Sequence, residues 1–149
     1  MANAVKWSAL AGATVAVTGT ALKSLSDGGN KLGIEYDNST NHNMYADFVG
    51  KYTFNTKPAA GAYVALYLLG APDGTNYEYG ADAVDPAANS WVGNFIVQAT
   101  SNTHYCVLKH ILLPNTKFKP LVMNEGGFMM SKTAGNLRVT FHVYNEEIQ

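Results

Sequence analysis

The stretch Gly61-Ala62-Tyr63-Val64-Ala65-Leu66-Tyr67-Leu68-Leu69-Gly70 is the longest apolar run of the 149-residue chain, and a turn signal, Pro72-Asp73-Gly74, follows it. The run is too short to cross a membrane as a helix, and Tyr, Val and Leu between Gly and Pro are typical of a strand. Side chains alternate between the two faces of a strand, yet neither face here is polar. The run therefore predicts a central strand with Val64, Leu66 and Leu68 in the core, and with a second face that a loop or a neighbouring subunit must cover.

Short stretches of alternating apolar and polar residues, separated by Gly, Pro and Asn turns, recur along the rest of the chain. Residues 137–144 alternate most regularly, and Pro120 within 118–123 predicts an edge strand or a bulge there. Residues 19–27 show neither caps nor a helical period, so no helix is predicted. The predicted strands are 14–18, 31–37, 44–52, 61–70, 91–98, 104–113, 118–123 and 137–144.

About eight antiparallel strands predict an all-β fold, a single-domain antiparallel β-sandwich of the jelly-roll type that comprises residues 1–149. An immunoglobulin-like sandwich is the alternative, because strand order is not visible in one sequence. Residues 1–12 are mostly small or apolar, and Trp7 is their one aromatic side chain. They are predicted to form a first strand or an extended N-terminal arm on a neighbouring subunit.

The composition fits either a protein with large contact surfaces or a β-rich fold full of Gly, Ala, Ser, Thr and Asn. Only 14% of the residues are charged, against roughly 25% in an average domain, while 47% are hydrophobic and the formal net charge is −1. This balance argues against binding to nucleic acid, and no segment is long and apolar enough for a transmembrane helix. The single cysteine, Cys106, excludes an internal disulfide, and the N-terminus resembles no signal peptide, so we expect synthesis in a reducing cytoplasm.

No motif predicts an enzyme, a cofactor or a metal site. The chain lacks a Gly-x-Ser-x-Gly elbow, a phosphate-binding loop and a dinucleotide glycine pattern. Alternation places His104, Cys106 and His110 on one strand face, but without the His-x-His spacing of a metal site. We therefore expect no catalytic residues, no cofactor and no bound metal.

Two other stretches carry aromatic or apolar side chains outside the predicted core. The long segment 71–90 holds Tyr77 and Tyr79, with Trp91 directly after it. These three could stack on a sugar, anchor another protein or pack on their own sandwich. Residues 126–130, Gly-Gly-Phe-Met-Met, predict either the start of a core strand or an apolar tongue buried in a neighbour, since Met adapts to a partner's shape.

Several segments resemble a family of small virion structural proteins of tailed bacteriophages, and the similarity extends over nearly the whole chain. The motifs that carry it are structural, so they imply no site residue. They are Val5-Lys6-Trp7-Ser8, residues 15–25, Tyr45-Ala46-Asp47-Phe48, residues 61–68, Asp73-Gly74-Thr75-Asn76-Tyr77 and Tyr144-Asn145-Glu146-Glu147.

The resemblance implies a capsid decoration, or cement, protein located on the outer capsid surface of the virion. Its expected partners are the major capsid protein and itself, as a homotrimer, and not nucleic acid or a membrane. The alternative is a carbohydrate-binding or tail- or fibre-associated virion module, with Tyr77, Tyr79 and Trp91 as the ligand-binding aromatics. The oligomer or capsid interface is predicted to contain Trp7, Tyr63, Tyr67, Phe128, Met129 and Met130.

Overall fold

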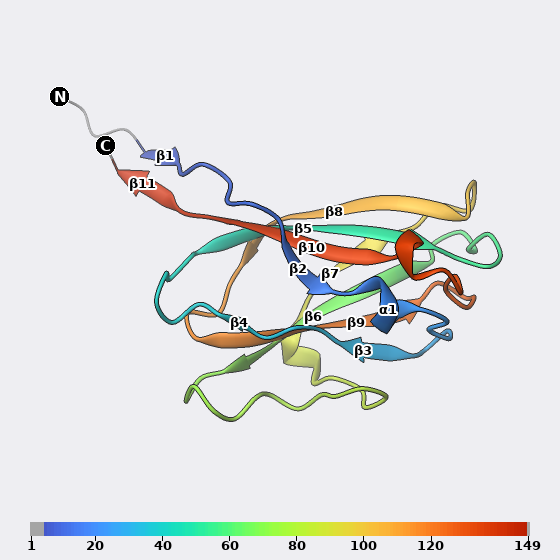
Figure 1. Ribbon diagram of the computed structural model, residues 1–149, viewed down its shortest axis with the longest axis horizontal. Coiled ribbons are helices and arrows are strands. Elements are labelled where there is room, and N and C mark those ends of the chain that lie inside the picture. The colour runs from blue at the N-terminus through green and yellow to red at the C-terminus, as the bar shows by residue number, and fades with distance from the viewer. Residues whose placement is uncertain (1–4, 149) are drawn as a thin grey trace.

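The computed structural model describes residues 5–148, and these form a sandwich of two antiparallel sheets with a two-stranded ribbon at one end (Figure 1). The elements are β1 (Val5–Trp7), β2 (Thr14–Val17), α1 (Gly19–Leu22), β3 (Asn30–Leu32), β4 (Tyr36–Asp37), β5 (Tyr45–Thr53), β6 (Tyr63–Ala71), η1 (Ala88–Ser90), β7 (Trp91–Ile96), β8 (Thr103–Leu112), β9 (Lys117–Glu125), η2 (Ala134–Asn136), β10 (Arg138–Tyr144) and β11 (Glu146–Ile148).

The strand order is that of a jelly roll. One sheet has the order β2-β10-β5-β8, and the other has the order β3-β9-β6-β7 with β4 also paired to β9. Apart from the β6–β7 pair, consecutive strands of the sandwich alternate between the two sheets or continue along the same partner, which distinguishes the fold from an immunoglobulin sandwich. The predicted jelly-roll sandwich is therefore confirmed. Beyond it, β1 pairs with β11 as a separate ribbon.

Strand β6 is central, between β7 and β9, as its composition predicts. Val64, Leu66 and Leu68 point into the core between the sheets. On the other face Leu69 is also buried, because the 72–90 loop folds over it: a Cβ on Gly80 of the loop would lie only 2.9 Å from a Leu69 methyl group. The sequence left open whether a loop or a neighbouring subunit covers this face of β6. In the structure the 72–90 loop covers Leu69.

Two local predictions are wrong. Residues 31–37 form two short strands. Gly33 still donates to the carbonyl of Pro120 on β9 (2.6 Å), but Ile34 turns away from β9 and donates to the carbonyl of Ala16 (2.8 Å). The second wrong prediction concerns Pro120, which lies in β9, an interior strand between β3 and β6, and not at an edge of the sheet. The break between β3 and β4 lies opposite Pro120, which has no N–H to return to Gly33.

The segment 19–27 begins with a single helical turn, α1, which the sequence did not predict. Thr18 caps it, since its hydroxyl accepts the N–H of Ala21 at 3.2 Å. One turn is too short to show a helical period. No helix within residues 5–148 is long and apolar enough to cross a membrane.

The core encloses one hydroxyl that has no hydrogen-bond partner among residues 5–148. The ring of Tyr52 is fully buried and packs against Gly50, where a Cβ would come within 2.3 Å of it. The Tyr52 hydroxyl makes no hydrogen bond to any residue in the described range, and burial raises its pKa well above the usual value. An unpaired buried hydroxyl destabilises the fold.

We predict that Tyr52→Phe leaves the free energy of unfolding unchanged or raises it by up to about 1 kcal/mol, because the substitution removes only the unpaired group. Urea unfolding measures the effect. Tyr144→Phe is the matched control: its hydroxyl donates to a carboxylate, so its loss should cost about 2 kcal/mol. An equal loss of stability in both variants would contradict the prediction.

Candidate functional site

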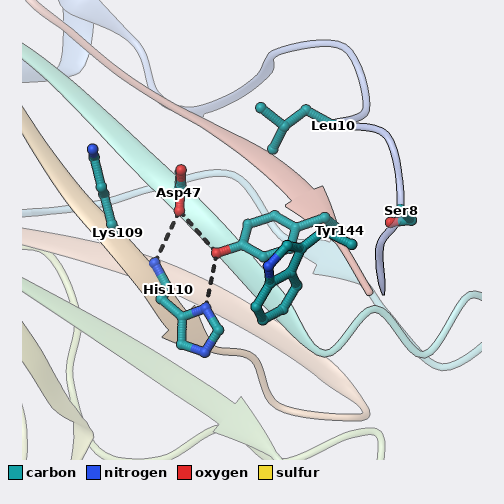
Figure 2. Close-up of a pocket in the computed structure, with 7 residues that line it drawn as sticks. Ser8, Leu10, Asp47, Lys109, His110 and Tyr144 are labelled. Atoms are coloured by element: carbon teal, nitrogen blue, oxygen red, sulfur yellow. Dashed lines mark hydrogen bonds between the residues drawn. The ribbon is translucent and has the colours of Figure 1, made fainter. Parts of the chain in front are cut away.

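A cleft of about 350 Å³ opens beside the terminal ribbon, at the end of the sheet that contains β5, β8 and β10 (Figure 2). It combines ring surfaces with charged and polar groups. It is lined by Trp7, Ser8, Leu10, Asp47, Lys109, His110 and Tyr144.

A β-bulge builds the polar side of the cleft. The register between β5 and β8 shifts at Asp47, so that Asp47 lies opposite two residues, Lys109 and His110. His110 has φ +57°, a left-handed conformation that is uncommon outside glycine. The Asp47 carboxylate accepts its backbone N–H at 2.9 Å and so holds the bulge. Bulges commonly re-aim a side chain next to a functional site.

The hydrogen bonds of the cleft fix the state of the His110 ring. The Tyr144 hydroxyl lies 3.0 Å from Asp47 Oδ1 and 3.2 Å from His110 Nδ1. Since an ionised carboxylate only accepts, the Tyr144 hydrogen goes to Asp47, and Nδ1–H of the imidazole donates to the Tyr144 oxygen. In the neutral ring Nε2 is then an acceptor. Burial, together with the bond to the charged Asp47, raises the pKa of Tyr144 to about 12.

The aromatic side of the cleft is a cluster of four rings. Tyr45 stacks on His110 at 4.1 Å between centroids. The indole of Trp7 stands nearly perpendicular to Tyr45, His110 and Tyr144, with centroids 5.1 to 5.9 Å away. These edge-to-face contacts orient Trp7, but 55% of its surface stays exposed. The ring is held in place without being enclosed.

Of the cleft residues, the sequence singled out only Trp7 as a contact residue. The alternation of β8 placed His104, Cys106 and His110 on one face, and this is wrong: His104 and Cys106 point inward, whereas the bulge turns His110 outward. A bulge leaves no composition signal, so neither the pairing of Asp47 with His110 nor the cleft was predictable from periodicity.

His104 and Cys106 do not form a reactive pair. Nδ1 of His104 accepts the N–H of Gln98 at 3.3 Å, and burial lowers the pKa of this imidazole. The Cys106 thiol donates to the carbonyl of Ile96 at 3.1 Å, and burial raises its pKa, which disfavours the thiolate. No group of three or more His, Cys, Asp or Glu within residues 5–148 could hold a metal ion.

The structure does not gather Tyr77, Tyr79 and Trp91 into one platform. Tyr77 and Tyr79 line a hollow of about 450 Å³, but Trp91 lies outside it, on β7. The Lys119 ammonium sits 4.0 Å from the centroid of Tyr77, whose hydroxyl donates to Glu35. One face of this ring is therefore already occupied.

The six predicted interface residues are scattered. Phe128 and Met129 are 39% and 41% exposed, on the β9–β10 connection. Met130, in contrast, is fully buried in the core and bridges to Phe54, so its assignment to a surface is wrong. The sequence could not show where the turn ends and the core begins.

Tyr63 and Tyr67 lie on the outer face of β6 and are half-buried. Burial raises the pKa of Tyr67, and the nearby Tyr63 raises it further by a smaller amount. Their orientation away from the core is the one that the sequence predicts.

The chain was compared with protein-family models, with curated proteins and with solved structures, and none of them matches it.

We predict that Tyr144 makes the protein sensitive to alkaline pH. The folded state keeps the Tyr144 proton to about pH 12, while an unfolded tyrosine loses it near pH 10. Its contribution to stability is therefore present below pH 10 and is lost as the pH rises through about 12. The difference in unfolding free energy between wild type and Tyr144→Phe should shrink over this window in urea titrations. A constant difference from pH 8 to 12 would contradict this account.

Proposed function

We propose that the protein is a non-enzymatic structural protein of a tailed-phage virion, a decoration protein that binds the outer capsid shell and bridges capsomers. The observation that carries the proposal is an apolar knob, defined as the exposed side chains of Phe128 and Met129. The low charge of the chain, its jelly-roll sandwich and its resemblance to phage virion proteins support the same function.

The knob is held rigidly by hydrogen bonds. The fully buried side-chain amide of Asn124 lies 3.0 to 3.1 Å from the carbonyls of Leu25, Ser26 and Phe128, and its oxygen accepts the N–H of Gly126. Asp27 accepts the N–H of Gly127 at 2.8 Å. Two large apolar side chains kept in water by a braced turn are typical of an interface anchor, because a partner binds them at little ordering cost.

The position of the knob suits attachment. The β9–β10 connection lies at the end of the sandwich opposite the β1–β11 ribbon (Figure 1). Burying one Phe or Met side chain contributes about 1.5 to 3 kcal/mol. Contacts of this size are weak singly, but become strong when an oligomer engages several capsomers at once. The proposed partner is thus the major capsid protein, in host cytoplasm where particles assemble.

Purified virions test the function directly. We expect the protein at a stoichiometric, capsid-scale copy number by quantitative mass spectrometry, and particles that lack it should recover this number when purified protein is added. The double variant Phe128→Ser/Met129→Ser should reduce occupancy at least about tenfold, because it removes the anchor.

Tyr79→Ser is the matched control, since Tyr79 is more exposed than either knob residue but lies on the 72–90 loop. Only a few copies per virion would instead indicate a tail or fibre component. Normal occupancy of the double variant would overturn the role of the knob.

Self-association is part of the proposal, with a homotrimer as the expected state. Tyr63 and Tyr67 are the candidate contacts, because the loop leaves them half-buried. Tyr67→Glu should dissociate the oligomer and leave the subunit folded, since a carboxylate there would be desolvated near Glu125 and Asp85. Light scattering and circular dichroism measure the two effects, and a monomeric wild type at micromolar concentration would refute self-association of the free protein.

A further inference from the structure

The polar groups of the aromatic cleft retain hydrogen-bonding capacity that the described part of the chain does not use. Oδ1 of Asp47 accepts two bonds, but no residue in 5–148 donates to Oδ2. Lys109, its neighbour across the bulge, makes no hydrogen bond or ion pair within the same range. Nε2 of His110 is an acceptor in the neutral tautomer. Asp47, Lys109 and His110 thus bring an anion, a cation and a neutral acceptor to the lining of the same cleft.

This combination restricts the chemistry of a ligand. Asp47 disfavours an anion such as a phosphate, and Lys109 disfavours a cation. A wholly apolar ligand would desolvate both charges without pairing them. Hydroxyl groups satisfy both, because each can donate to a carboxylate and accept from an ammonium.

The exposed indole supplies the complementary apolar contact. Three edge-to-face neighbours fix the orientation of Trp7, so little order is lost when a ligand packs against it. A ring with one apolar face and a rim of hydroxyls matches an aromatic surface beside a carboxylate and an ammonium. The left-handed His110 shows that the fold tolerates backbone strain to build this arrangement.

We infer that the cleft binds a saccharide, with a pyranose ring against Trp7 and adjacent hydroxyls on Asp47 Oδ2 and Lys109 Nζ. This site differs from Tyr77, Tyr79 and Trp91 in that the structure brings its groups together. The inference does not rest on the proposed virion role, because it concerns the isolated protein.

The two tryptophans of the chain allow a direct measurement. In Trp91→Phe, Trp7 is the single indole and reports on the cleft. Its emission should change saturably on titration with at least one of glucose, galactose, mannose, rhamnose and N-acetylglucosamine. Lys109→Ala in the same background should weaken that binding about tenfold, through loss of a charge-assisted hydrogen bond.

Lys132→Ala, at an exposed lysine outside the cleft, should leave binding unchanged, and glycerol, which has hydroxyls but no ring, should give no saturable signal. Circular dichroism confirms that each variant is folded. The inference is overturned if no sugar of the panel changes Trp7 emission, if glycerol acts like the sugars, or if Lys109→Ala binds as well as its parent.

Discussion

The burial of β6 on both faces is the constraint on which the rest of the structure depends. A strand without a polar face cannot sit at a wet surface. Its inner residues Val64, Leu66 and Leu68 require the opposing sheet, and its outer Leu69 requires the 72–90 loop. Glu78 attaches that loop to β6, because its carboxylate accepts hydrogen bonds from the Gly70 N–H and the Ser90 hydroxyl. One apolar strand therefore determines both the two-layer architecture and the course of the longest loop.

Periodicity was enough to predict the layers, but not the places where the ladder is interrupted. The alternation along β6 and β10 predicts their inward faces correctly, because the position of each residue along a strand is enough to assign its side chain to one face. Interruptions depend on long-range partners: Ile34 turns away from β9 to reach Ala16, and Lys109 with His110 forms a bulge opposite Asp47. These partners are distant in sequence, and the candidate cleft is made of such pairings. That is why Trp7 could be named from the sequence but the residues around it could not.

The molecule has two chemically different ends. The knob of Phe128 and Met129 is apolar and braced by backbone bonds, whereas the cleft at the ribbon end combines rings with charges. At each end a polar side chain accepts a backbone N–H and so holds the local backbone. Asn124 accepts from Gly126 beside the knob, and Asp47 accepts from His110 in the cleft. If the knob is attached to a capsid shell, the cleft faces outward, where a polysaccharide could reach it.

The pairing of β2 with β10 and of β1 with β11 limits when the sheet can be completed during synthesis. Among the described residues β2 has a strand partner only in β10, and β1 only in β11. Residues 5–17 emerge from the ribosome before their partners, which are synthesised more than a hundred residues later. Closing such a long loop is slow, so the sheet β2-β10-β5-β8 is completed only after translation has passed β10. Until then β5 exposes the edge that β10 later covers, a period when chaperone binding would have the greatest effect on yield.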